Sequence, residues 1–211
     1  PSIFVANEFF DALAIKQFQK KGNLWFEKFV SLNKKTTSFL EKKINMKNYE
    51  KKIDFKISKN QNFIEYSELG LKYLKDICEI IKKNNGGLLL IDYGYTNKKM
   101  KNTLQAVSNH KFANILDNIG NSDITHNISF DFFCKFVKKV NGLEINLTTQ
   151  KEFLFKMGIK ERAEIISKNL TFSKKADIFY RLNRLISEKQ MGNLFKVMLI
   201  THNKINFKTG F

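Results

Sequence analysis

Arginine is scarce in this chain of 211 residues: only Arg162, Arg181 and Arg184 occur among 37 basic residues, and the others are lysines. The formal net charge is +17 and the isoelectric point is about 9.7. Such a charge favours anionic partners in general, but arginine is the residue that recognises phosphates and bases bidentately. Because the lysines are spread along the whole chain, we interpret the charge as a compositional bias. We expect weak, salt-sensitive attraction to anions and no specific nucleic-acid partner.

Cysteine is also scarce, since Cys78 and Cys134 are the only two and form no CxxC pair. The three histidines are not spaced as metal ligands with them, so we predict no metal site and expect buried thiols in a reducing compartment. No apolar run of about 18 residues and no signal peptide are visible, so we expect a cytoplasmic protein without a membrane span. The chain starts at Pro1 and leads directly into a strand, so we expect it to begin inside a domain.

A glycine-rich turn from a strand into a helix is missing as well. Gly86 and Gly87 precede a strand, which is the wrong order for a phosphate cradle. The length nevertheless suffices to bury one sizeable core, and 21 phenylalanines predict that this core is Phe-rich.

The apolar run at residues 2–6 ends abruptly in Asn7 and Glu8, with Asp11 close behind. Such a run predicts a buried parallel strand, and ligands bind at the C-terminal edge of parallel sheets. Two carboxylates and an amide at that edge suit a cationic or polar substrate group. The alternative is that Asn7 and Asp11 cap a short helix while Glu8 is solvated.

The rest of the chain predicts alternating strands and helices in a single domain, 1–211. Residues 15–19 and 24–32 alternate around a turn and predict a β-hairpin, and 33–60 is expected to be an irregular insertion with a short helix near 39–44. Ser67 is the expected N-cap of a helix that ends near Lys83, and residues 88–94 form a second apolar strand, which carries Asp92. The other predictions are strands at 63–66, 103–107, 143–147 and 194–200, a helix at 130–140, and a helical cover at 150–187 hinged at Gly158.

Short motifs run through the chain in a definite order. They are ANEFFDAL at 6–13, QF at 17–18, IDYG at 91–94, TLQA at 103–106, DIT at 123–125, TQ at 149–150 and FKV at 195–197. This ordered set resembles the MidA family, the bacterial and mitochondrial class I S-adenosylmethionine (SAM)-dependent methyltransferases linked to respiratory complex I. The resemblance extends over essentially the whole chain.

The resemblance implies an α/β fold with a class I methyltransferase (Rossmann-like) sheet, here lacking its first strands, with a β-hairpin and a C-terminal helical insertion. It also implies SAM as the cofactor. The family carries its glycine-rich SAM loop ahead of the NEFFDAL motif, so the chain resembles the C-terminal portion of the family, and the cofactor-binding residues are unknown. His126 stands one place before the family's histidine position, and we interpret it as a loop histidine.

The activity implied by the resemblance is protein arginine N-methylation, with a respiratory complex I subunit or a similar protein as substrate and partner. A guanidinium acceptor needs carboxylates that hold it as a fork. The implied roles are catalytic for Asn7, Glu8 and Asp11, and substrate-binding for Asp92, Tyr93 and Gln17. The resemblance implies the mitochondrial matrix as the location in a eukaryote, and it leaves a homodimer open.

Alternatives remain at the level of residues and of function. Asp92 could instead cap a turn after its strand. A non-catalytic module that keeps the fold and assists complex I assembly is the main functional alternative. RNA binding rests on the net charge alone.

Overall fold

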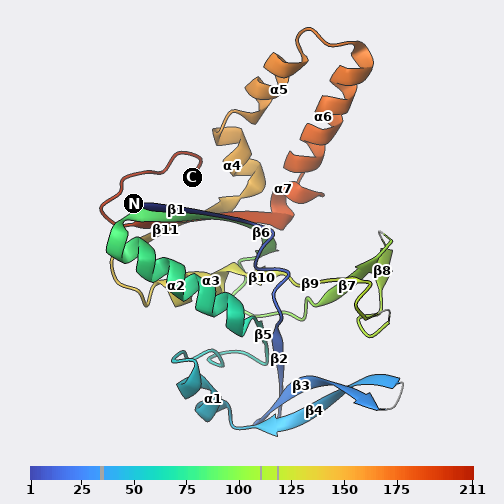
Figure 1. The fold of residues 1–211 in the computed structure, drawn as a ribbon, viewed down its shortest axis with the longest axis vertical. Helices are drawn as coiled ribbons and strands as arrows, with labels where there is room; N and C mark the ends of the chain where they lie inside the picture. Colours follow the sequence, from blue (N-terminus) through green and yellow to red (C-terminus); the bar gives the residue numbers. More distant parts are fainter. Residues whose placement is uncertain (34–35, 110, 118) are drawn as a thin grey trace. The chain divides into compact units, whose positions relative to one another are not determined.

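The computed structural model describes residues 1–33, 36–109, 111–117 and 119–211, and they divide into two compact units (Figure 1). The first unit comprises Pro1–Phe9, Leu74–Tyr95 and Val137–Phe211. The second unit comprises Phe10–Tyr73 and Thr96–Phe136. The single domain expected from the sequence stays a prediction.

A mixed sheet with the strand order β1-β6-β12-β11 forms the centre of the first unit. β1 (Ser2–Asn7) is parallel to β6 (Gly86–Tyr95), as their apolar runs predict. The last strand, β12 (Phe195–His202), lies antiparallel between β6 and β11 (Leu143–Thr149). The inner positions of β6 and β12 account for their long apolar runs, because inner strands are covered on both faces.

β1 is less buried than the sequence predicts. It stands at one end of the strand order, and its side chains alternate between half-buried and exposed. Ile3 and Val5 are 83% and 68% exposed, respectively. The strand predicted at residues 2–6 is present, but the prediction that it is buried is wrong. An apolar run indicates a strand, but it does not show whether both faces of that strand are covered.

Helix α2 (Glu68–Asn84) leads into the first unit and supports one face of its sheet (Figure 1). The Ser67 hydroxyl accepts a hydrogen bond of 2.9 Å from the amide of Gly70, which confirms the predicted N-cap. Leu74, Cys78 and Ile81 are buried at spacings of four and three residues, so they form one apolar stripe.

The helices predicted after β11 are present in the first unit. They are α4 (Gln150–Lys156), α5 (Ile159–Ser167), α6 (Phe172–Ile186) and the short α7 (Met191–Leu194). Gly158 separates α4 from α5 in the left-handed conformation, with φ of 76°, which confirms the predicted hinge. Figure 1 shows α5 and α6 as a pair that projects away from the sheet.

A second sheet, with the strand order β4-β3-β2-β5, belongs to the second unit. It contains β2 (Lys16–Lys21), β3 (Leu24–Asn33), β4 (Thr36–Ile44) and β5 (Phe63–Tyr66), all antiparallel. The predicted hairpin is confirmed as β2 and β3. The irregular insertion expected at 33–60 is wrong, because this segment supplies β4 and helix α1 (Met46–Lys52). Pairing with β3 stabilises β4. Because the side chains of β4 are mostly exposed, its sequence shows no hydrophobic periodicity that would predict a strand.

The remainder of the second unit is a small sheet with an aromatic helix. β7 (Gln105–Ser108) pairs with β8 (Lys111–Ala113) and with β9 (Asp123–Thr125). The short strand β10 (Ile128–Ser129) leads into α3 (Phe130–Val137). Phe10, Phe18, Phe130 and Phe133 are all buried, so the predicted Phe-rich core is confirmed here.

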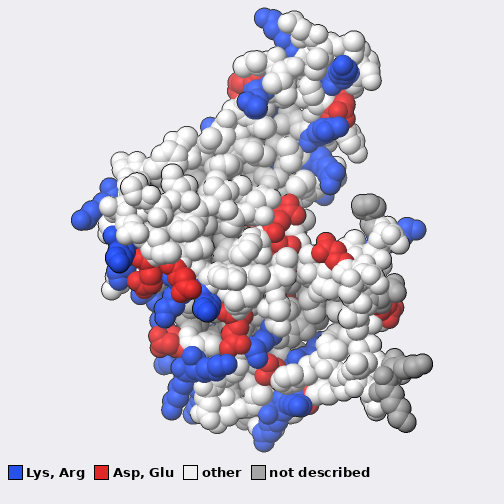
Figure 2. Space-filling view, viewed as in Figure 1, with Lys and Arg blue, Asp and Glu red and all other residues white. Residues whose placement is uncertain are grey.

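Charge is distributed over both units. Figure 2 shows Lys and Arg side chains on the projecting helices as well as on the second unit, with fewer Asp and Glu between them. Within the described ranges, none of the helices combines the length and the apolar character needed to cross a bilayer.

Candidate functional site

The C-terminal end of β1 lies beside Ile91 of β6, and β6 continues from there to Tyr95. The parallel register pairs Asn7 with Ile91, and the amide of Glu8 donates a hydrogen bond of 2.9 Å to the Ile91 carbonyl. Asp92 is the next residue of β6. The predicted parallel pairing of the two strands is therefore confirmed, whereas the catalytic and substrate-binding roles stay predictions.

Asn7 and Asp92 lie on opposite faces of this edge. Paired residues of parallel strands share a face and successive residues alternate, so Asn7 shares its face with Ile91. Asn7 and Glu8 are exposed, whereas Asp92 is fully buried. The Oδ1 atom of Asp92 accepts a hydrogen bond of 2.9 Å from the Tyr93 amide. A substrate on the exposed face of Asn7 therefore does not reach the buried side chain of Asp92.

Tyr93 returns to the face of Asn7 and is held by an aromatic contact. It pairs with Phe195 of β12, and the two ring centroids are 5.4 Å apart at an interplanar angle of 70°. The edge-to-face contact fixes the Tyr93 ring at the strand end. Tyr93 is thus placed beside the exposed Asn7 face, as a substrate-binding role requires.

Lys196 is a residue of this edge that the sequence analysis did not single out. It pairs with Asp92 in the antiparallel register of β12 and β6, so both share one face of the sheet. Burial lowers the pKa of its ammonium group, and its Nζ donates a hydrogen bond to the Asn193 carbonyl. A single lysine within the apolar strand FKVMLI was the signal that could have revealed it.

The backbone of Glu8 is unusual. Its φ is 47°, in the left-handed region that residues other than glycine adopt at a cost of about 1–2 kcal/mol. This conformation ends β1 and turns the chain out of the sheet immediately after Asn7. Strain of this kind gathers at functional sites, which is compatible with a functional Glu8, and the exposure of Glu8 also fits the alternative in which it is solvated.

Gly86 serves the close approach of two strands. Its φ is 116°, and a Cβ atom added there would lie 1.9 Å from the Ser2 carbonyl oxygen. Glycine at this position therefore allows β6 to begin beside β1. This strand-pairing role agrees with the inference that Gly86 and Gly87 form no cofactor cradle.

Asp11 belongs to the second unit, where it lies at the start of the core. Its side chain is buried, and its carbonyl accepts a hydrogen bond of 3.1 Å from the His126 amide. The neighbouring Phe10 ring meets Phe133 edge-on, with centroids 5.3 Å apart. Residues 10–13 form a turn closed by the Leu13 amide and the Phe10 carbonyl instead of the single helical turn of the alternative.

Gln17 is part of a buried hydrogen-bond network around Glu65. Its Nε2 donates to the Glu65 carboxylate at 2.6 Å and to the Asn102 side-chain oxygen at 2.8 Å. Glu65 also accepts from the Thr103 hydroxyl and from the amides of Thr103 and Leu104, the amides at 3.1–3.3 Å. This network engages the side-chain amide of Gln17. Gln17 is therefore better suited to hold neighbouring segments in place than to donate a hydrogen bond to a substrate.

Glu65 is the second residue that sequence reasoning missed. It is only 4% exposed, and it joins β2, β5 and the loop at 102–104 through one carboxylate. A glutamate inside the short apolar strand FIEY carried a weak signal, because an alternating strand places such a residue on a solvated face as readily as in a core.

His126 is buried beside this network. Its side chain is 4% exposed, and burial lowers its pKa, while the carboxylates of Glu65 and Asp11 oppose that shift. Its Nε2 has no hydrogen-bond partner in the part of the chain that the structure describes. The neutral imidazole therefore agrees with the interpretation of His126 as a structural loop histidine.

The described residues contain no group of three or more His, Cys, Asp or Glu side chains that could hold a metal ion. For SAM, the exposed amide of Asn7 and the exposed carboxylate of Glu8 offer hydrogen-bond acceptors for hydroxyl or ammonium groups at the strand edge. The residues of this edge thus fit one side of such a cofactor.

Comparison with known proteins gives a consistent picture. Residues 1–149 match a family described as "Putative S-adenosyl-L-methionine-dependent methyltransferase". The chain is 25% identical over 199 residues to the mitochondrial protein arginine methyltransferase NDUFAF7 of Danio rerio, covering 92% of this chain and 46% of that protein. It is 30% identical over 164 residues to the Caenorhabditis elegans homologue, covering 76% and 38%, respectively.

Solved structures share the fold. A protein from Burkholderia thailandensis superimposes with a TM-score of 0.84 at 21% identity, covering 100% of this chain and 57% of that one. A likely methyltransferase from the same organism, bound to S-adenosyl-homocysteine, superimposes with a TM-score of 0.80 at 20% identity, covering 100% and 56%, respectively. The α/β fold is thereby confirmed, and the chain spans about half the length of the curated relatives it matches. The family match, over more than half of the chain, shows that the chain belongs to the MidA/NDUFAF7 family of SAM-dependent methyltransferases.

Proposed function

We propose that this chain forms the C-terminal part of a class I SAM-dependent protein methyltransferase whose acceptor is an arginine side chain. The supporting observation is the meeting of β1 and β6, which brings Asn7, Glu8 and Asp92 to one sheet edge in a member of this family. The names of the NDUFAF7 relatives support arginine as the acceptor.

The chain's own residues would position the acceptor. SAM supplies a methyl group on a sulfonium, and the enzyme has to align donor and acceptor and exclude water. In the first unit, Glu8 and Asn7 would hold the guanidinium and keep one nitrogen aimed at the methyl group. Asp11 is buried in the second unit, and its catalytic role would be an indirect one, through the turn at residues 10–13. In the first unit, Tyr93 would line the substrate side, and the buried Asp92 would support it through the hydrogen bond to the Tyr93 amide. In the second unit, Gln17 would contribute to substrate binding with its amide held by Glu65.

SAM binding needs more than this edge. A glycine-rich loop is not among the 211 residues, and the curated relatives are about twice as long as the matched region. We propose that a further segment with such a loop completes the cofactor site.

The partner would be a protein substrate, such as a respiratory complex I subunit. The mitochondrial names of the curated relatives support a matrix location if the source is a eukaryote, and the cytoplasm otherwise. A homodimer is compatible with this proposal, and no specific nucleic-acid partner is part of it.

A second candidate is a non-catalytic module that binds a complex I subunit during assembly. It gains weight only if the protein as encoded also lacks a glycine-rich loop. Calorimetric titration with SAM separates the two candidates. Saturable binding to the protein as encoded supports the enzyme, and no heat at high micromolar SAM supports the module.

The substitution Glu8→Gln tests the catalytic assignment. It keeps the size of the exposed side chain and removes the charge that would hold a guanidinium, so methyl transfer should fall by about 100-fold or more. The measurement is incorporation of radiolabelled methyl groups from SAM into arginines of a hypomethylated lysate from the source cells.

The matched control is Glu164→Gln, an exposed residue of α5 in the same unit. It should keep the wild-type rate, and both variants should keep the wild-type circular dichroism spectrum. Full activity in Glu8→Gln would remove Glu8 from the catalytic set.

A further inference from the structure

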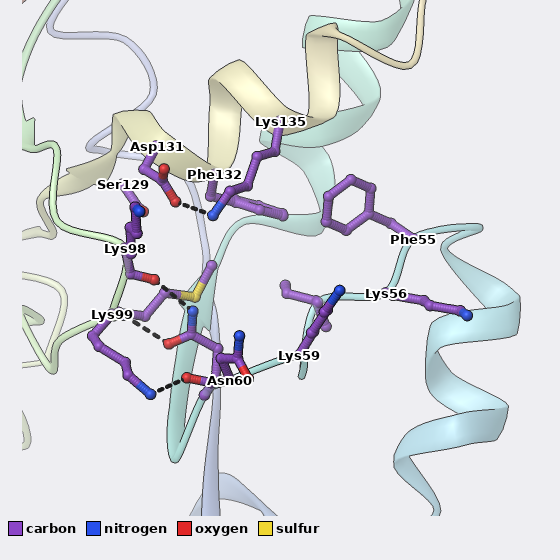
Figure 3. A pocket seen from close by; sticks show the side chains of 13 residues that line it. Phe55, Lys56, Lys59, Asn60, Lys98, Lys99, Ser129, Asp131, Phe132 and Lys135 are labelled. Atoms are coloured by element: carbon purple, nitrogen blue, oxygen red, sulfur yellow. Dashed lines mark hydrogen bonds and ion pairs between the residues drawn. The ribbon is translucent and has the colours of Figure 1, made fainter.

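The second unit contains a hollow that the proposed methyl-transfer edge does not use. Its volume is about 590 Å³, within the range of ligand sites. Three segments line it: residues 55–61, residues 98–100 and the first turns of α3 with Ser129 (Figure 3). All of these residues belong to the second unit.

The rim of the hollow is strongly basic. Its charged lining residues are five exposed lysines and a single carboxylate, Asp131; the lysines are Lys56, Lys59, Lys98, Lys99 and Lys135. This excess is larger than the ratio of 37 basic to 20 acidic residues in the whole chain. Lys135 forms an ion pair of 2.5 Å with Asp131, and Lys99 donates to the Asn60 carbonyl. A concave site lined by one sign of charge attracts the opposite charge.

The wall of the hollow is aromatic. The half-buried Phe55 meets Phe132 edge-on, with centroids 5.4 Å apart, and packs against Phe136 at 5.8 Å. Buried Ile57 and Met100 also contribute to the lining. The hollow therefore offers apolar contact under a basic rim, which suits a ligand that has both an apolar and an acidic part.

Two hydrogen bonds hold opposite sides of the hollow together. The Nε2 of Gln61 donates to the Lys98 carbonyl at 2.8 Å, and its Oε1 accepts from the Met100 amide at 2.9 Å. Gln61 is buried, so these bonds are shielded from water. The site is thereby largely preformed, which lowers the ordering cost of binding.

We propose that this hollow docks an acidic segment of the protein substrate that carries a phenylalanine or a similar apolar side chain. This inference rests on the proposed methyltransferase function, whose partner is a protein. The apolar side chain would contact Phe55 while carboxylates on either side meet the lysines. The proposed occupant follows from charge complementarity and from the aromatic wall.

The chemistry favours a peptide over a nucleic acid or a phosphate. The three arginines of the chain, which suit bidentate phosphate contacts, lie outside the second unit. Figure 3 shows Lys59 and Lys135 reaching toward the hollow from opposite sides, whereas the Lys56 side chain points away from it.

The double variant Lys59→Glu/Lys98→Glu tests the site. The probe is a fluorescent peptide of Glu and Asp with a central Phe, and fluorescence anisotropy measures its Kd. We expect the Kd to rise by about tenfold or more, since two attractive charges become repulsive. The matched control Lys72→Glu/Lys111→Glu makes the same charge change at exposed lysines of the second unit outside the hollow, and it should alter the Kd less than about twofold.

Two further probes test the ligand class. A peptide with Gln and Asn in place of the acidic residues, and one with Ala in place of Phe, should both bind more weakly than the parent. Equal binding of the Gln/Asn peptide, equal weakening in the control variant, or tighter binding of oligouridine RNA than of the peptide would overturn the proposal.

The readouts separate docking from catalysis. Peptide binding is measured without SAM, so it reports on the hollow even if methyl transfer is never observed. If methyl transfer occurs, Lys59→Glu/Lys98→Glu should raise the KM for the acidic protein substrate and leave kcat unchanged. An unchanged KM would refute docking while leaving the methyltransferase assignment intact.

Discussion

At the scale of single residues, polar side chains within apolar strands carry most of the chemical information in this chain. Asn7 and Glu8 stand out in the sequence because they end an apolar run, and the structure places them at an exposed strand end. Glu65 and Lys196 are single charges inside strands, and only burial distinguishes them from solvated residues. The sequence thus shows which polar residue stands in a strand, but it does not show whether that residue is buried.

Glu65 should be essential for the stability of the second unit. Glu65→Ala leaves the buried amide of Gln17 and the half-buried amides of Thr103 and Leu104 without their acceptor, so the free energy of unfolding should fall by roughly 2–4 kcal/mol. Urea unfolding followed by circular dichroism measures the change. Glu79→Ala on the exposed side of α2 is the control and should stay within about 0.5 kcal/mol of the wild type. An equally small effect at Glu65 would contradict the structural role of the network.

At the scale of elements, local signals located most helices and strands, and long-range pairing decided the rest. The caps at Ser67 and Thr149 and the hinge at Gly158 are local, because a helix end is settled within a few residues. β4 is different, since its backbone hydrogen bonds go to β3 and its side chains are mostly exposed. The segment 33–60 therefore gave no periodic signal and was predicted as irregular.

Gly86 should be required for the pairing of β1 with β6. Gly86→Ala adds a Cβ atom that would meet the Ser2 carbonyl oxygen, in addition to a disfavoured φ of 116°. We expect a loss of about 3 kcal/mol or more in the free energy of unfolding.

Gly142→Ala is the matched control for this prediction. Its φ is also positive, at 89°, but nothing lies within 4 Å of the added Cβ atom, so it should cost only about 1 kcal/mol. Thermal and urea unfolding of both variants measure the difference. Equal losses would show that backbone strain alone, without the steric clash, determines the effect.

At the scale of the whole molecule, two surface properties follow from the composition and from the edge of the first sheet. The net charge of +17 disfavours self-association at low salt. Against this, β1 presents the exposed Ile3 and Val5 beside an apolar groove of about 480 Å³ in the first unit. Exposed apolar strands at the edge of a sheet are sites of association. The further segment that we propose to complete the cofactor site would cover such a surface.

The double variant Ile3→Ser/Val5→Ser should therefore associate less than the parent chain at moderate salt, where charge repulsion is screened. Light scattering as a function of protein concentration measures this, and the melting temperature should change little because both side chains are exposed. Phe4→Ser on the other, half-buried face is the control and should lower the melting temperature. Unchanged scattering in the double variant would exclude this edge as the site of association.

Most of the helices and strands, and the family to which the chain belongs, follow from the amino-acid sequence alone. Apolar runs, helix caps and glycines act over a few residues, so most elements can be predicted without coordinates. The family can be predicted in the same way, because its ordered motifs from Asn7 to Val197 are sequence motifs. The strand–helix–strand pattern also predicted that the strands carrying Asn7 and Asp92 pair in parallel, because parallel strands joined by a helix commonly lie in the same sheet.

The face and the environment of each of these residues are set by contacts that form only when the chain folds. The strand register placed Asn7 and Asp92 on opposite faces, pairing with β3 turned 36–44 into a strand, and three segments distant in sequence came together around the lysine-lined hollow. These outcomes depend on contacts between residues far apart along the chain. Burial, register and the local electric field are properties of such contacts, and no short window of sequence contains them.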